Sequence, residues 1–157
     1  MGWVIWAMQL AKWKGARVIA VASGAHEAFL RSIGADEFID YTKTAPEDVA
    51  HDIDLVLDTL GGSTTGRFVR TIKRGGALFP VFPLGFDGAD DAGKHGVTVS
   101  ATQVRSDGAQ LAEIGKLLDA GIIRVAVDGS FPLGEARKAH ERAAKGHIRG
   151  KIVLTVR

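Results

Sequence analysis

The sequence predicts an α/β layer structure with a largely parallel sheet. Short, continuous apolar runs rich in β-branched residues, such as RVIAVAS at 17–23, are typical of strands buried on both faces. They alternate with stretches whose apolar residues recur every three or four positions, as on one face of a helix. Strands alternating with helices favour parallel pairing, and a length of 157 residues suits one domain.

The opening stretch, MGWVIWAMQLAKWKG at 1–15, predicts a helix buried on most sides and ended by Lys12, Lys14 and the cap candidate Gly15. Its apolar run is only about ten residues long, whereas a membrane-spanning helix needs roughly 20. The lysines follow the run rather than precede it, unlike those of a signal peptide. We therefore expect no contact with a membrane.

The rest of the first half contains one further clear helix. Phe29, Leu30 and Ile33 share one helical face, and Gly34 is a stop signal. The other expected elements are strands at 37–41 and 54–62, with a brief helical turn at 45–52 between them.

The second half repeats the alternation. The expected elements are a helix at 64–74, a turn at Gly75–Gly76, strands at 77–82, 97–104 and 151–156, and a helix within 131–146. Residues 83–96 have the composition of a mobile loop. Ser106 or Asp107 can cap another helix, which Gly121 ends. The apolar residues of that helix at core spacing are Leu111, Ile114, Leu117 and Leu118.

The composition excludes several classes of function. Basic and acidic residues are interspersed, with a net charge of only +2, so no nucleic-acid surface is expected. The absence of cysteine rules out disulfides and thiolate metal sites, and it fits a cytoplasmic protein. The histidines show no close ligand pairing, so we predict no metal site. There is no GxSxG motif that would indicate a nucleophilic serine.

Ligands of doubly wound sheets bind outside the carboxyl ends of the strands. Four segments follow expected strands in this way, and they are 23–26, Tyr41, 59–62 and 82–86. If the strands are parallel, these segments meet at one edge of the sheet. The pattern alone predicts a binding site there and names no ligand.

Several segments in order resemble the medium-chain dehydrogenase/reductase family, in its zinc-free quinone oxidoreductase branch. They include QLAKWKGARVIAVAS, FLRSIGADEFIDY, DLVLDTLGG and GKIVL. The resemblance covers the nucleotide-binding half of such enzymes. It implies a Rossmann-like, doubly wound fold in which residues 1–157 form a single truncated dinucleotide-binding domain. It also implies an NADPH-dependent oxidoreductase of quinone or enoyl reductase type acting on a small molecule.

The same resemblance assigns residues to the cofactor. Ser23 and His26 fall beside the adenosine 2′-phosphate of NADPH, and Tyr41 near the same phosphate. Thr59 falls on the adenine and ribose side. Beside the nicotinamide lie Phe82 and Leu84. Each also has a structural interpretation, as a helix cap, a boundary aromatic or a surface residue.

Two departures from the family pattern stand out. The family has a strand and a glycine-rich turn before the helix that ends in QLAK, but here Val4 stands at the place of the last glycine and the first strand is missing. Bulky Trp3 and Ile5 add to the crowding of the pyrophosphate site, which predicts impaired cofactor binding. The missing strand predicts a gap between the strands starting near Arg17 and Asp54, with unpaired edges and exposed apolar surface.

Two alternatives therefore remain open. A cofactor-independent isomerase, lyase or cyclase would reuse the vacated cleft for a small apolar substrate, with tryptophans, Phe82 and Phe86 lining it. Its acid/base candidates are Asp58, His26 and Tyr41. The other alternative is a non-catalytic subunit. In either case we expect a homo-oligomer formed through the exposed sheet edge or the apolar N-terminal helix.

Overall fold

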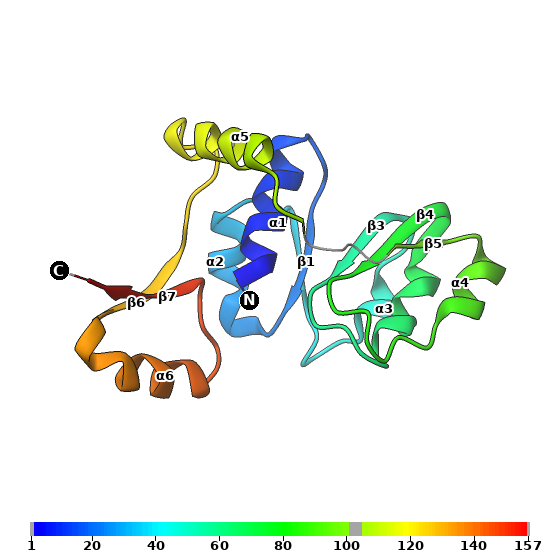
Figure 1. Ribbon diagram of the computed structural model, residues 1–157. Coiled ribbons are helices and arrows are strands. Elements are labelled where there is room, and N and C mark those ends of the chain that lie inside the picture. The colour runs from blue at the N-terminus through cyan, green and yellow to red at the C-terminus, as the bar shows by residue number, and fades with distance from the viewer. Residues whose placement is uncertain (1, 101–104, 157) are drawn as a thin grey trace. The chain divides into compact units, whose positions relative to one another are not determined.

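The computed structural model describes residues 2–100 and 105–156 (Figure 1). The chain divides into two compact units, which are described separately. Unit 1 comprises Met1–Val18, Leu30–Asp36 and Asp107–Arg157, and unit 2 comprises Ile19–Phe29 and Glu37–Ser106. The helix α2 (Glu27–Ser32) crosses the boundary between them.

Unit 2 contains five parallel strands in two sheets. The strands are β1 (Ile19–Ala22), β2 (Glu37–Asp40), β3 (Ile53–Asp58), β4 (Ile72–Pro80) and β5 (Thr98–Val99). The helical elements are η1 (Gly24–His26), α3 (Pro46–Val49), η2 (Thr65–Thr71) and α4 (Ala89–His95). β1 pairs with β2, and the second sheet has the order β3-β4-β5, all in parallel. The predicted α/β class with parallel pairing is confirmed.

The sheet of unit 2 is interrupted where the sequence predicts it. Among the described strands, β1 pairs only with β2, and the outer neighbour of β3 is missing. Leu55 and Leu57 of β3 and Val21 of β1 are exposed. These residues form unpaired edges and apolar surface where the sequence predicts a gap between the strands starting near Arg17 and Asp54.

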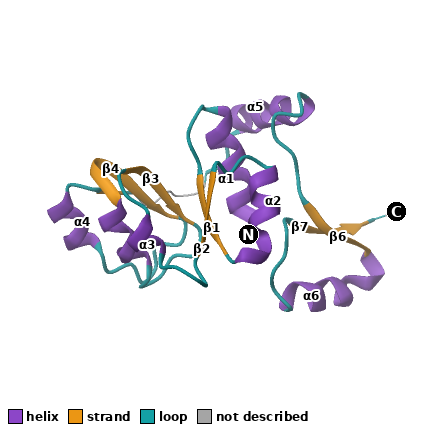
Figure 2. Cartoon of the chain, turned by 180° about the vertical axis from the view of Figure 1, so that it is seen from behind, coloured by secondary structure: helices purple, strands orange, loops and turns teal. Residues whose placement is uncertain are grey.

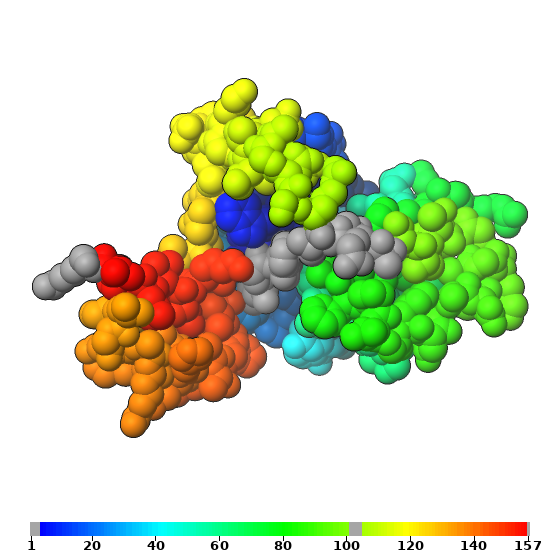
Figure 3. All heavy atoms as spheres, viewed as in Figure 1, coloured from blue at the N-terminus to red at the C-terminus, as the bar shows by residue number. Residues whose placement is uncertain are grey.

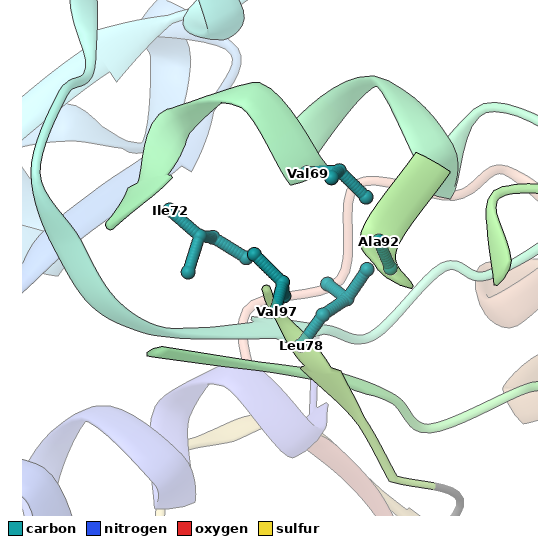
Figure 4. Close-up of a cluster of buried hydrophobic side chains, with 5 residues drawn as sticks. All are labelled: Val69, Ile72, Leu78, Ala92 and Val97. Atoms are coloured by element: carbon teal, nitrogen blue, oxygen red, sulfur yellow. The ribbon is translucent and has the colours of Figure 1, made fainter. Parts of the chain in front are cut away.

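The core of unit 2 lies on one face of the β3-β4-β5 sheet. Figure 2 shows α3 and α4 on that face, and Figure 4 shows the cluster of buried side chains. Its members are Val69, Ile72, Leu78, Ala92 and Val97. Leu78 is fully buried in the central strand, so β4 contributes the centre of this core.

Unit 1 contains the remaining elements. They are α1 (Gly2–Trp13), α5 (Gly108–Asp119), β6 (Val127–Pro132), η3 (Leu133–Glu135), α6 (Ala136–Ala144) and β7 (Lys151–Thr155). β6 and β7 pair in parallel, and α6 packs against both strands. Their orange and red atoms lie together in Figure 3. Ile5 and Met8 are buried, as expected for α1. No helix in the described ranges is long and apolar enough to cross a membrane.

Several local predictions are wrong. Gly75 and Gly76 do not end an element but lie inside β4, where the pairing with β3 shifts register and Gly75 adopts φ of +83°. They form a bulge, which glycine permits. Part of the expected loop 83–96 is the helix α4, which has acidic residues in its first turn, and Gly96 caps its end at φ of 68°.

Other differences concern burial and strand length. In α5 only Leu117 is buried, while Leu111 is 69% exposed, because its position in the turn nearest Asp107 faces solvent. The strand expected at 97–104 is described only as Thr98–Val99, and residues 101–104 lie outside the described part. β6 was not predicted, because its sequence VDGSFP lacks an apolar alternation.

Candidate functional site

The predicted site residues lie in unit 2, at the carboxyl ends of its strands. They form two groups that belong to separate sheets. One follows β1 and β2, and it contains Ser23, His26 and Tyr41. The other follows β3 and β4, and it contains Asp58, Thr59, Phe82 and Leu84.

The first group is held together by backbone contacts. The amide of Tyr41 donates to the carbonyl of Ala22 at 3.3 Å, and the amide of His26 donates to the carbonyl of Ser23 at 2.9 Å. The side chain of Tyr41 is 52% exposed, whereas that of His26 is buried. The Ser23 hydroxyl does not cap η1. Two hydroxyl groups, of Ser23 and Tyr41, thus follow neighbouring strand ends.

A charged pair that the sequence analysis missed accompanies this group. Lys43 lies 3.5 Å from the carboxylate of Asp40, and its side chain is largely exposed. The hydroxyl of Thr42 donates to Asp40 at 2.6 Å and is the main cause that lowers the pKa of Asp40, aided by the amide of Thr42 and by Lys43. A cation two residues after a strand-end tyrosine was the signal in the sequence that could have identified Lys43.

The carboxylate of Asp40 also lies against the backbone of Gly24. A Cβ atom at position 24 would be 2.6 Å from Asp40 Oδ2. A side chain at this position would therefore displace the carboxylate or the turn. Gly24 lets the turn after β1 and the end of β2 approach each other.

The second group is organised by Asp58, which is 8% exposed at the end of β3. Its Oδ1 accepts hydrogen bonds from the amides of Leu60 at 2.9 Å and Gly61 at 3.2 Å, and its Oδ2 accepts one from the Thr65 hydroxyl at 2.5 Å. The aromatic and aliphatic tips nearby, Phe82 and Leu84, are exposed. This edge thus contains a buried carboxylate whose hydrogen bonds are made within the protein, and two exposed apolar side chains.

Phe86 occupies a different place from the one expected in the cofactor-independent alternative. It is partly buried and packs against the core cluster of unit 2, where Val69 and Ala92 also lie. Its ring is therefore a part of the core packing. The predicted lining role of Phe82 stays a prediction, as does that of the tryptophans, of which Trp3 has a side chain outside the described part.

The signature residues in unit 1 have structural partners. The side chain of Gln9 donates to the carbonyl of Arg124 at 3.1 Å and accepts from its amide at 2.9 Å. Lys12 contacts both carboxylate oxygens of Asp36 at 2.9 Å. The amide of Val18 donates to Asp36 at 2.7 Å; with Lys12, it lowers the pKa of Asp36. The QLAK and GAD segments thus stabilise the fold.

Unit 1 also contains an open pocket of about 430 Å³, lined in part by Lys12, Trp13, Ile122 and Arg124. None of the predicted site residues lines it. Lys12 is already paired with Asp36, and Arg124 donates to the carbonyl of Ser32 at 2.9 Å. The charges of this pocket are committed to the protein's own groups.

Metal binding receives no support from the described ranges. Within residues 2–100 and 105–156, no group of three or more His, Asp or Glu side chains could hold a metal ion. A catalytic zinc site needs about three protein ligands. We therefore derive no step through zinc from this part of the protein.

Comparisons of this chain with protein families and with curated proteins match it to dehydrogenases and reductases. The family described as zinc-binding dehydrogenase matches residues 33–154. The mouse mitochondrial NAD(P)H oxidoreductase RTN4IP1 is 34% identical and is matched over 96% of this chain and 44% of its own length. Acryloyl-coenzyme A reductase of Metallosphaera sedula is 31% identical, with 96% of this chain and 47% of that protein covered.

Solved structures agree. The quinone oxidoreductase from Coxiella burnetii matches with a TM-score of 0.87 and 31% identity, over 96% of this chain and 48% of that one. A mycobacterial protein solved with NADPH, Rv1454c, matches with a TM-score of 0.77 and 26% identity, over 99% and 53%. The chain thus spans about half the length of these relatives.

One prediction is contradicted by these relatives. The sequence was expected to be that of a cytoplasmic protein, but the RTN4IP1 proteins of mouse, human, zebrafish and cattle are all named as mitochondrial. The absence of cysteine carried that expectation. It fails as an argument because a low cysteine content reports on redox chemistry and not on the compartment itself.

Proposed function

Because the chain belongs to the zinc-binding dehydrogenase family of medium-chain dehydrogenases/reductases, we propose that it binds NADPH and forms the nucleotide-binding part of a quinone or enoyl reductase. The observation that carries the proposal is the set of polar groups at the ends of β1 and β2. Ser23 and Tyr41 offer hydroxyl groups, and Lys43, which lies 3.5 Å from Asp40 but is largely exposed, offers a positive charge that can also reach a phosphate. Hydroxyl and ammonium donors suit a phosphate.

In the proposed reaction, the residues of this chain bind the cofactor and orient it. NADPH supplies a hydride when it is bound. The group after β1 and β2 would hold its 2′-phosphate, and Thr59 its adenosine side. Phe82 and Leu84 would form an apolar wall at the nicotinamide and exclude water from it.

A titration of the chain with NADPH and NADH, followed by cofactor fluorescence, tests the proposal. We expect tighter binding of NADPH, and we expect Lys43→Gln to weaken NADPH about tenfold while leaving NADH unchanged, since one charge-assisted hydrogen bond contributes roughly 1.5 kcal/mol. Lys116→Gln, on α5, is the matched control. Failure of both cofactors to bind at millimolar concentration would refute the proposal.

The same titration bears on the predicted impairment of cofactor binding. Val4 stands where the family's last glycine is expected, inside α1. A valine side chain limits the approach of a pyrophosphate to the helix N-terminus. The substitution Val4→Gly is expected to tighten NADPH binding. An unchanged affinity would show that the side chain at position 4 does not limit NADPH binding.

Self-association is the second part of the proposal. The free edges of β1 and β3 offer unpaired backbone groups, and Leu55 and Leu57 offer apolar surface. Pairing between copies would cover both. Light scattering should give more than the monomer mass of 16.6 kDa, and a monodisperse monomer would contradict this part.

A further inference from the structure

The carboxylate of Asp58 connects three consecutive parts of the chain. It belongs to the last residue of β3, it accepts the amides of Leu60 and Gly61 in the following turn, and it accepts the hydroxyl of Thr65 at the start of η2. Thr65 is fully buried. The strand, the turn and the helical segment are therefore tied to one buried acceptor.

The turn held by Asp58 is in backbone contact with the segment after β4. Gly61 has φ of +71°, and a Cβ atom there would be 2.2 Å from the carbonyl oxygen of Phe82. The amide of Val81 donates to the carbonyl of Asp58 at 2.8 Å. A shift of the turn therefore also shifts Phe82, at the sheet edge.

The three donors are matched better by a carboxylate, which accepts on both oxygens, than by an amide. An aspartate is a pure acceptor with two oxygens, whereas an asparagine presents an NH₂ group on one side of its head. With the amide oxygen toward the Leu60 and Gly61 amides, the NH₂ group would face the Thr65 hydroxyl, which would have to turn its own hydrogen away from residue 58. That buried hydroxyl hydrogen would then need another acceptor, so the site favours a carboxylate, which accepts all three hydrogen bonds.

We infer that Asp58 is a positioning residue for the nicotinamide cofactor. It places the turn at 59–62 and, through Gly61, the Phe82 backbone, and it does not exchange protons with a substrate. Both of its oxygens accept hydrogen bonds from the turn and from η2. The inference rests on the proposed binding of NADPH, and it assigns a different role from the acid/base one considered for Asp58 above.

The test combines two test variants and two control variants with two measurements on the whole chain. Asp58→Asn replaces one acceptor oxygen of the carboxylate by an NH₂ donor. Thr65→Val removes the hydroxyl while keeping the side-chain volume. Thr65→Ser restores the hydroxyl. Asp107→Asn, at the N-cap of α5, is a control that neutralises a carboxylate of similar role in unit 1. The measurements are NADPH affinity and amide hydrogen exchange at Leu60 and Gly61.

Asp58→Asn and Thr65→Val should each weaken NADPH binding about tenfold and accelerate exchange at both amides, as expected for one lost buried hydrogen bond. Thr65→Ser should stay within about twofold of the parent, and the amide of Leu78 should keep its rate in all variants. Faster exchange with unchanged NADPH affinity would overturn the inference, as would no change in either measurement. If the parent chain binds no NADPH, the proposed function itself fails.

Discussion

Two adjacent glycines in the turn after β3 allow a direct test of how that turn packs. Gly61 and Gly62 have φ of +71° and +86°, so an alanine at either position adopts a strained conformation. The surroundings differ. A Cβ atom at position 61 would meet the Phe82 carbonyl at 2.2 Å, whereas one at position 62 would have no atom within 4 Å.

The expected difference follows from these surroundings. A positive φ costs an L-residue about 1–2 kcal/mol, partly offset by about 0.4–1 kcal/mol from the smaller entropy of the unfolded chain. Both substitutions share these contributions. Gly61→Ala adds a clash with backbone, which we place at about 1–3 kcal/mol by analogy with overpacked cores. The difference between the two variants should therefore be about 1–3 kcal/mol.

Urea unfolding followed by circular dichroism measures the difference, and a thermal scan provides a second estimate. For a chain of this size, each kcal/mol corresponds to roughly 2–4 °C in Tm. Under the proposed function, Gly61→Ala should also weaken NADPH binding more than Gly62→Ala. Equal destabilisation by the two alanines, within about 0.5 kcal/mol, would refute the packing of Gly61 against Phe82.

Three further predictions concern stability. Leu78→Ala should destabilise unit 2 by about 2–5 kcal/mol, because the fully buried side chain leaves a cavity, and a loss below about 1 kcal/mol in urea unfolding would contradict its central position. Asp107→Ala should cost about 1 kcal/mol, since Asp107 accepts the amide of Gln110 at 3.0 Å, and Asp107→Asn should retain most of that. The pKa of Asp36 is lowered from 3.8 by the Val18 amide and by Lys12, so its contribution to stability is present above that pH and is lost as the pH falls through the lower folded value. In acid titrations of unfolding, the difference in stability between Asp36→Asn and the parent should therefore be present at about pH 5 and shrink as the pH falls below 3.8, and a constant difference would argue against the assignment.

Local sequence was sufficient for most elements and for their parallel arrangement. The β-branched run that contains β1 and the apolar run of β3 are typical of strands, so the type of these elements follows from their own residues, although Leu55 and Leu57 of β3 are exposed. The cap at Asp107 is equally local, because its side chain reaches an amide three residues away. The unpaired edge of β3 among the described strands also agrees with the gap that the sequence predicts there.

The sequence predicted which residues of the candidate site follow the ends of strands, but not the contacts that their side chains make. Parallel strands bring their carboxyl ends to one side, so Ser23 and Tyr41 could be grouped in advance, and the backbone contact between Tyr41 and Ala22 agrees. The partners of Asp58 could not be foreseen in the same way. Its bond to Thr65 depends on how the turn and η2 fold back, which many residues decide together.

The sequence by itself determined the α/β class, most of the strands and helices and the family, because these depend on periodicity and on short local signals. Only the tertiary structure decided which apolar residues are buried and which polar side chains hold the chain together. Leu111 and Leu117 share the same helical pattern, yet only Leu117 has a neighbouring element to cover it. Gly75 and Gly76 form a bulge rather than a turn, since the pairing of β4 with β3 continues beyond them. Burial and register are properties of the contact between segments, and a single segment does not contain them.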